Sequence, residues 1–378
     1  MPNNLQASVL IIGIQVPAVD IDAGSLRLFR ILQIITGLSR ELFFLAVKPF
    51  DLPAYRSRLQ EDCRKLRDMG VVLPEEQEVV AERFLQNHGR RFDLIILSDE
   101  FVASRYLQMV RYYCPDAMVV FDTVDLHYLR IYREARLTRN RYLIKMAIAT
   151  RHRELQAMRE SDLTLVTSDF EQQKLWSHFD RARIRLLPTI YEVNPDEGLP
   201  FHQRRGLIFV GSFAHAPNRD ALMVLLDLFP RLRQAIPGLT LRIVGSDPPR
   251  EIVENNLPAG IEILGHVENL EVLLRKSRLS VAPLRFGAGV KGKVLESMAS
   301  GLPVIATPIA AEGIGARDGY HLAVGELENE FICKLLEVYK ESSLWRKLQN
   351  NGRQLISENF SFQVVENILK ELVTMSLK

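Results

Sequence analysis

Short apolar runs alternate with longer amphipathic stretches along the whole chain of 378 residues. This alternation is typical of βαβ units, in which parallel strands are joined by helices. In the first half, the apolar runs predict strands at Ser8–Ile14, Leu42–Val47, Leu94–Ser98, Met118–Asp122, Leu163–Thr167 and Ile184–Leu187. Helices are expected between them, for example at Ser25–Thr36, Tyr55–Met69 and Glu100–Tyr113.

The alternation stops once and then begins again. Residues 188–206 contain three prolines and two glycines among polar side chains, which is typical of an interdomain linker. Further strands are predicted at Leu207–Val210, Thr240–Val244, Ile261–Leu264, Leu279–Ala282 and Pro303–Ala306, and helices near Leu327–Ser342, Leu344–Ser357 and Phe362–Met375. The sequence thus predicts an α/β chain of two Rossmann-like, doubly wound domains facing across a cleft. We expect residues 1–190 and 207–361 to form these domains, joined by residues 191–206, with a final helix at 362–378 packed back on the first domain.

Composition narrows the function classes. Hydrophobic residues make up 47% and charged residues 25%, the balance of a soluble enzyme, and a net charge of +2 argues against a nucleic-acid-binding protein. The three cysteines are far apart without a CxxC pair, so neither a disulfide framework nor a zinc site is expected. The N-terminus lacks a basic start and a cleavage site, and no apolar window is long enough to span a membrane. We expect a cytoplasmic protein.

The segment from Phe286 to Gly301 carries the clearest chemistry. An expected strand runs into a glycine-rich turn, and a helix is expected from Lys293 to Ser300. Glycines let backbone N–H groups approach phosphate oxygens, and a helix N-terminus adds partial positive charge. Lys291 and Lys293 add full charges. The segment therefore predicts a phosphate site.

Two motif templates fit this turn incompletely. Gly287, Gly289 and Gly292 match the dinucleotide fingerprint GxGxxG, but Glu312, at the expected distance for the ribose carboxylate, follows a strand that has already ended. The same turn matches a P-loop until Val294, which stands where a P-loop needs a Ser or Thr to hold Mg²⁺. Neither an oxidoreductase nor an NTPase is well supported.

A third template is a family resemblance. The run from Gly289 to Thr307, with Glu296 on its helix, resembles the donor-site signature of the GT-B glycosyltransferases of family 4. The resemblance implies that the helix N-terminus, which follows Gly289 and Val290, holds the diphosphate of a nucleotide sugar, and the charges of Lys291 and Lys293 are expected to contribute to diphosphate binding. It also implies that Glu296 accepts hydrogen bonds from the ribose. Ala288 stands where the family usually has a second Glu that contacts the sugar.

Other segments extend the resemblance over nearly the whole chain. Gly24 resembles the family's first-domain glycine loop, and Arg27, one turn later, is expected to face the acceptor or an anion. Asn218 is expected as a helix N-cap beside the phosphate loop, and the backbone of Val267 is expected near the nucleobase. The complete set of expected donor contacts is Gly24, Gly211, Ser212, Asn218, Val267, Gly289, Val290, Lys291, Lys293 and Glu296.

Two acidic segments suggest further roles. Asp125 and His127 follow an expected strand where the family has an active-site His, so His127 is expected to bond a sugar hydroxyl or phosphate and Asp125 to orient it. Asp20 and Asp22 formally match the metal-binding DxD of GT-A enzymes, but that motif normally follows a complete sheet. No cluster has metal-ligand spacing, so no metal cofactor is expected.

Two helical features complete the prediction. Ser168, with a Glu three residues later, predicts a capping box at the start of a helix. Residues 130–159 hold nine Lys or Arg and two acids, interleaved with apolar side chains. Such a stretch is typical of contact with an anionic membrane surface, here the inner face, and equally of a solvated helix face.

The residues and the resemblance together predict a glycosyltransferase. It would move a sugar from a nucleotide-diphosphate sugar to a glycan or lipid-linked acceptor, with retention of configuration and without a metal. Two alternatives remain open: a non-catalytic nucleotide-sugar-binding or scaffold protein, which Ala288 favours, and a sugar-nucleotide epimerase on the same fold. Transfer to an acceptor separates the first prediction from both.

Overall fold

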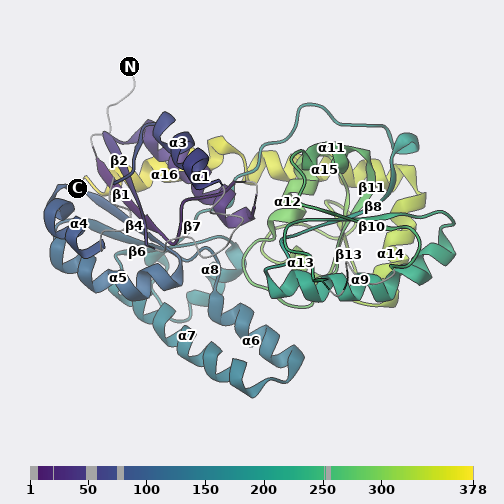
Figure 1. Ribbon diagram of the computed structural model, residues 1–378, viewed down its shortest axis with the longest axis horizontal. Coiled ribbons are helices and arrows are strands. Elements are labelled where there is room, and N and C mark those ends of the chain that lie inside the picture. Colours follow the sequence, from purple (N-terminus) through teal and green to yellow (C-terminus); the bar gives the residue numbers. More distant parts are fainter. Residues whose placement is uncertain are drawn as a thin grey trace. The chain divides into compact units, whose positions relative to one another are not determined.

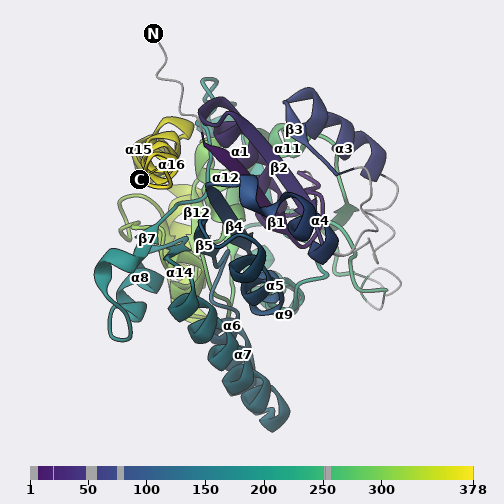
Figure 2. The same cartoon turned by 90° about the vertical axis from the view of Figure 1, so that its left-hand side faces the viewer.

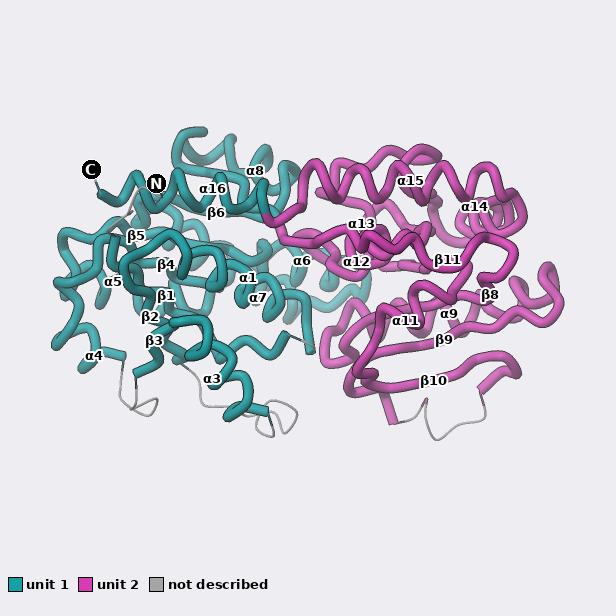
Figure 3. Tube along the Cα trace, turned by 90° about the horizontal axis from the view of Figure 1, so that it is seen from above, with its two compact units in different colours: residues 1–188, 363–378 teal, residues 189–362 magenta. Residues whose placement is uncertain are grey.

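The computed structural model describes residues 7–19, 21–47, 58–74, 81–250, 252 and 257–377. The chain divides into two compact units, residues 1–188 with 363–378 and residues 189–362 (Figure 3). Each unit contains a parallel sheet covered by helices (Figure 1). Asp20 and the start of the helix expected at Tyr55–Met69 lie outside the described residues.

The first unit contains a seven-stranded sheet in the order β3-β2-β1-β4-β5-β6-β7 among its described residues. All of its strand pairs are parallel. Every residue of the central strands β1 and β4 is buried, as expected for a sheet with helices on both faces. The strands are β1 (Ser8–Gly13), β2 (Glu41–Ala46), β3 (Val71–Val72), β4 (Leu94–Ser98), β5 (Met118–Asp122), β6 (Leu163–Val166) and β7 (Ile184–Leu186).

Helices connect these strands and cover the sheet. They are α1 (Ala23–Leu38), α3 (Leu59–Asp68), α4 (Ala81–His88), α5 (Glu100–Tyr113), α6 (His127–Thr138), α7 (Arg141–Glu160), α8 (Asp169–Leu175) and α16 (Phe362–Met375). Short 3-10 turns lie at Gly89–Arg91 and Arg181–Arg183. Nearly all of α16 belongs to the first unit, although residues 189–361 of the second unit precede it.

The basic stretch 130–159 forms a helical hairpin of α6 and α7. Arg139 ends α6 in the left-handed conformation, with φ 53°, and the side chain of Asn140 caps α7 by accepting from Tyr142 N at 2.9 Å. The hairpin projects away from the sheet of its own unit in both side views (Figures 1 and 2).

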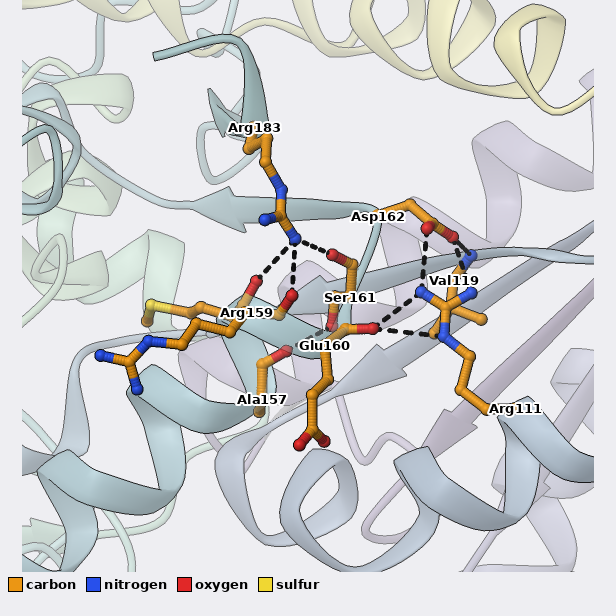
Figure 4. Close-up of polar contacts among 9 residues, drawn as sticks. Arg111, Val119, Ala157, Arg159, Glu160, Ser161, Asp162 and Arg183 are labelled. Carbon is orange, nitrogen blue, oxygen red and sulfur yellow. Dashed lines mark hydrogen bonds and ion pairs between the residues drawn. The ribbon is translucent and has the colours of Figure 1, made fainter. Parts of the chain in front are cut away.

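The far end of α7 is fixed to the first unit by two arginines (Figure 4). Arg183 donates to the carbonyls of Met158, Arg159 and Ser161. Arg111 donates to the carbonyl of Glu160 at 2.8 and 3.2 Å. The last carbonyls of a helix lack partners within the helix, so these contacts satisfy groups that would otherwise depend on water.

The second unit contains a six-stranded parallel sheet in the order β10-β9-β8-β11-β12-β13 among its described residues. Its strands are β8 (Arg205–Val210), β9 (Leu241–Val244), β10 (Ile261–Gly265), β11 (Ser277–Ala282), β12 (Val304–Ala306) and β13 (Ala323–Val324). Its helices are α9 (Ala216–Ala235), α11 (Leu270–Lys276), α12 (Gly292–Ala299), α13 (Pro308–Ala311), α14 (Asn329–Lys340) and α15 (Ser342–Asn359), with a 3-10 turn at Phe201–Gln203. The predicted fold class, two doubly wound α/β sheets, is confirmed.

Residues 191–206, expected as a linker, lie within the second unit. Arg204 in this segment has 0% of its surface exposed, and its guanidinium donates to the carbonyls of Leu199 and Glu197, each at 2.6 Å. Burial, together with the nearby Arg353 and Arg278, lowers the pKa of Arg204 to about 10. The proline-rich segment is therefore held against the unit by a buried cation bonded to its backbone.

In the described ranges, no helix is both long enough and apolar enough to cross a membrane.

Candidate functional site

The carboxyl end of β8 brings together three of the expected donor contacts. A Cβ atom on Gly211 would lie 2.8 Å from both the amide of Asn218 and the Nζ of Lys293. Lys293 donates to Asn218 Oδ1, and its Nζ lies 4.5 Å from the centre of the Phe209 ring. Gly211 is thus required by close approach, since any side chain would displace the other two residues.

Asn218 holds this arrangement in place, although not in the way expected. The helix α9 begins at Ala216 and has His215 as its N-cap, so the prediction of Asn218 as N-cap is wrong. The Asn218 amide instead donates to the carbonyl of Ser212 at 2.7 Å while its oxygen accepts from Lys293. The Ser212 hydroxyl accepts from Ser246 at 3.0 Å. The loop after β8 is therefore fixed from both sides.

Lys293 is the most unusual group of the second unit. Burial lowers its pKa to about 7, and no carboxylate in the described part of the chain forms an ion pair with it. Taking an ammonium out of water without a counter-charge is costly, and such groups concentrate at functional sites. An anion bound beside Lys293 would supply the missing charge.

The glycine-rich turn ends at the N-terminus of α12. Gly289 has φ 62°, in the left-handed region that favours glycine. Lys291 is the N-cap of α12, and its Nζ donates to the carbonyl of Gly289 at 2.7 Å, so this buried lysine braces the turn. Within α12, Lys293 and Glu296 are the partly exposed residues; at a spacing of three they share one face of the helix. Val290 precedes them in the half-buried turn.

Val267 lies after β10 with its side chain directed inward. It packs against the buried residues Ile208, Val244, Leu274 and Leu302. The expected contact with a nucleobase concerns the backbone of Val267, and it stays a prediction.

In the first unit, Asp125 and His127 meet at the carboxyl end of β5. His127 Nε2 lies 2.9 Å from Asp125 Oδ1 and 3.3 Å from Asp99 Oδ2. Arg130, one turn into α6, places its Nε 3.2 Å from Asp125 Oδ2. The pairing of Asp125 with His127 follows the expectation from sequence, whereas Asp99 and Arg130 are additional members.

This cluster fixes the charge of His127. Burial alone would lower the pKa of His127, but the Asp125 carboxylate and then Asp99 raise it to about 9. Burial would likewise raise the pKa of Asp125, but His127 and Arg130 hold it well below its usual range. Burial raises the pKa of Asp99. His127 is therefore an imidazolium at neutral pH and acts as a hydrogen-bond donor.

Two buried glutamates hold the beginning of α6. Glu154 of α7 accepts from the backbone N–H of His127 at 2.8 Å and of Tyr128 at 3.2 Å. Glu171 of α8 accepts from Leu126 N at 3.0 Å. Both glutamates have 0% of their surface exposed, and burial raises the pKa of Glu154 to about 8. They occupy the positive end of the α6 dipole and so position His127.

Sequence reasoning missed Glu154 in this role and did not foresee the contact of Glu171 with Leu126. Ser168 accepts from Glu171 N at 3.2 Å, so the predicted N-cap is confirmed. The Glu171 side chain also accepts hydrogen bonds from Leu126 N and from the hydroxyl of Thr167. A signal existed for Glu154, because an isolated acid in a strongly basic helix needs a specific partner.

Arg27 lies in the interior of the first unit. It has 3% of its surface exposed, and its guanidinium donates to both carboxylate oxygens of Asp122 at 2.6 and 2.9 Å. The expectation that Arg27 faces an acceptor conflicts with this burial, because such a contact would require the ion pair to open. Gly24 lies in the first turn of α1, which Asp22 caps by accepting from Ser25 N.

Among the described residues, no group of three or more His, Cys, Asp or Glu has the arrangement of a metal site. Asp20, the first residue of the DxD match, lies outside the described ranges.

Sequence comparisons relate the second unit to a known family. Residues 204–341 match the family model of the group 1 glycosyl transferases. The chain is 27% identical over 177 residues to an uncharacterized 44.6 kDa protein in the cps region of Klebsiella pneumoniae, covering 44% of this chain and 45% of that protein. It is 35% identical over 165 residues to an uncharacterized glycosyltransferase of Methanocaldococcus jannaschii, covering 41% and 44%. The alignments thus span less than half the length of these curated relatives.

Solved structures resemble the chain over nearly its whole length. HepE of Anabaena, in complex with UDP and glucose, has a TM-score of 0.69 at 13% identity, covering 98% of this chain and 100% of that one. A sucrose-phosphate synthase of Thermosynechococcus elongatus has a TM-score of 0.69 at 16% identity, covering 97% and 98%. At such identities the likeness is one of fold. The chain therefore has the GT-B fold, and residues 204–341 of its second unit match the family model of the group 1 glycosyl transferases.

Proposed function

We propose that this protein is a glycosyltransferase that moves a sugar from a nucleotide-diphosphate sugar to a glycan or lipid-linked acceptor. The observation that carries the proposal is the meeting of Gly211, Asn218 and Lys293 in the matched domain. It leaves the half-buried ammonium of Lys293 without a counter-ion among the described residues, beside the start of a helix. HepE, of the same fold, was solved with UDP and glucose.

In this proposal the second unit holds the leaving group. Lys293 and the N-terminus of α12 bind the diphosphate and stabilise the charge that develops on it as the glycosidic bond breaks. Glu296, on the same face of α12, accepts hydrogen bonds from the ribose hydroxyls. Lys291 contributes by fixing the turn at Gly289.

His127 serves as a donor to a sugar hydroxyl or a phosphate oxygen. An imidazolium with a pKa of about 9 is a poor base at neutral pH, so general-base removal of the acceptor proton does not fall to it. Asp125 holds the ring of His127, and Glu154 holds its backbone N–H. Retention of configuration and independence of metal belong to the proposal through the family resemblance.

The test begins with donor binding by the full chain. Thermal unfolding is followed with UDP-, GDP-, ADP- and CMP-sugars, since a ligand that binds only the native state at 100 times its Kd adds about 2.7 kcal/mol of stability. We expect one nucleotide class to stabilise the protein and Glu296→Ala to remove most of that effect. Equal affinity of the Glu296→Ala variant would contradict the ribose assignment.

Transfer is then measured with the donor so identified. Release of nucleotide together with a glycosylated acceptor, unchanged by EDTA, is the expected result. Binding without transfer or hydrolysis, unaffected by His127→Ala, would favour the non-catalytic protein. Appearance of an epimerised donor without any acceptor would favour the epimerase.

A further inference from the structure

The outer end of the α6–α7 hairpin has an unusual surface. This hairpin tip, residues 136–148, contains no Asp or Glu. Its exposed cations are Arg136, Arg139, Arg141 and Lys145. Its exposed apolar side chains are Leu137, Tyr142, Met146 and Ile148, of which Tyr142 and Ile148 are 69% and 65% exposed.

The inner part of the hairpin is organised differently. There Arg130 pairs with Asp125, and Arg153 pairs with Glu100. Among the described residues, none of the four tip cations forms an ion pair. Within α7, Ala147 is buried, whereas Tyr142, Met146 and Ile148 are exposed.

An ordinary solvated helix face does not account for this surface. Solvated faces usually mix charges of both signs and keep large aliphatic side chains covered. Here cations alone alternate with large apolar groups; Arg141 and Lys145 are one turn apart, as are Tyr142 and Met146. Interfacial helices on lipid have this composition, because apolar side chains enter the acyl boundary while Lys and Arg reach the phosphates.

We propose that the hairpin tip binds a bilayer surface that carries anionic lipid headgroups. The chain would rest on the bilayer through this tip without spanning it. The anchoring of α7 by Arg183 and Arg111 favours such binding, because a hairpin fixed at its base loses little conformational freedom at the surface.

Other occupants fit the tip less well. In a symmetric dimer through the tip, four cations would face the four cations of the second copy without intervening acids. A nucleic acid would match the charge but would leave the side chains of Tyr142, Met146 and Ile148 without an apolar partner.

Flotation of the full chain with vesicles tests the proposal. Vesicles of 7:3 phosphatidylcholine and phosphatidylglycerol are compared with pure phosphatidylcholine at about 0.1 and 0.5 M salt, where the Debye length falls from about 10 Å to less than half of that. We expect binding to the anionic vesicles, weaker binding at high salt, and little binding to the neutral vesicles. Absence of binding to anionic vesicles overturns the proposal.

Two tip variants and one matched control identify the surface. Changing the four tip cations to Gln should weaken binding by at least about 100-fold, since each Lys or Arg near an anionic surface contributes roughly fivefold. Tyr142→Ser with Ile148→Ser should weaken binding at both salt concentrations. The control changes four exposed cations of the second unit, Lys276, Lys340, Arg346 and Lys347, to Gln.

The control should bind as the wild type does. If it loses as much affinity as the tip variant, net charge alone explains the binding and the proposal fails. If sedimentation instead shows a dimer that the tip variant abolishes, the tip is an interface between copies. Donor-induced stabilisation should be the same in the wild type and the tip variant, so failure of this proposal is distinguishable from failure of the proposed function.

Discussion

At the scale of single residues, Lys293 combines burial, a pKa of about 7 and a position at the start of α12. A bound diphosphate would favour its charged form and raise its pKa. Donor binding above pH 7 would therefore take up a proton, and affinity should fall as the pH rises through 7, by up to about tenfold per unit. Isothermal titration between pH 6 and 9 measures this dependence.

Variants at the same position separate this effect from others. Lys293→Met should bind the donor weakly and with little pH dependence, because it carries no titrating group. Lys293→Arg keeps a charge throughout the range and should also give a flat profile. A wild-type profile equal to that of Lys293→Met would rule out Lys293 as the diphosphate ligand.

His127 leads to a second prediction about pH, which concerns the stability of the first unit. Its pKa is about 9 in the folded protein against an ordinary value of 6.5. The stability that this adds is fully present below pH 6.5 and is lost as the pH rises to 9. We expect a decrease of about 3 kcal/mol in the free energy of unfolding of the first unit over that window.

Urea unfolding can isolate this unit, because the two tryptophans, Trp176 and Trp345, lie in different units. In a Trp345→Phe background, Trp176 fluorescence reports on the first unit. Adding His127→Gln should make the decline between pH 6.5 and 9 shallower. An unchanged slope would show that other groups, such as Glu154, cause it.

Single residues also show which contacts of the His127 cluster could be predicted from the sequence and which could not. Asp125 and His127 are two positions apart after one strand, so their pairing is a local property that the sequence can predict. Asp99 and Glu154 come from other elements; the basic helix around Glu154 indicates that this acid needs a partner, but not that the partner is the backbone of His127. For Arg27 the prediction from sequence was wrong, because a charged side chain on a helix was expected to be accessible, whereas the structure buries it against Asp122.

At the scale of elements, the anchoring of α7 gives a direct test. Arg183→Ala would remove the donors to three carbonyls near the end of α7 and should destabilise the first unit by about 1–2 kcal/mol. Hydrogen exchange of amides near Ser161 should accelerate. Arg159→Ala is the matched control, because its exposed side chain takes no part in these bonds (Figure 4). Equal destabilisation by both changes would refute the anchoring role.

Elements with a long periodic signal were predictable, and short ones were not. The apolar runs at β1, β4, β5, β8 and β11 are long enough to stand out from the sequence. The strands β3 and β13 have two residues each, too few for any pattern, and they form only because neighbouring strands offer open edges. The segment around Arg204 was interpreted from its prolines, whereas one buried side chain decides its place.

At the scale of the whole molecule, the two units should respond differently to the donor. Hydrogen exchange of the full chain with saturating nucleotide sugar should slow in peptides spanning 211–218 and 289–296, where the donor contacts are proposed. Peptides spanning the tip, 136–148, should be unchanged. Lys293→Met should lose most of the protection at the same donor concentration. Protection confined to the first unit would place the nucleotide elsewhere.

The length of α6 has a consequence for substrate geometry. The helix has twelve residues, from His127 to Thr138 in the hairpin tip, which is about 18 Å along its axis. With the tip on a bilayer, the length of α6 would limit the distance between His127 and the lipid headgroups to at most about 18 Å. An acceptor anchored in the same bilayer would need a polar segment long enough to reach His127. In a series of acceptors with polar segments of increasing length, turnover should therefore begin only above a minimum length. Extending α6 by whole turns should increase that minimum length.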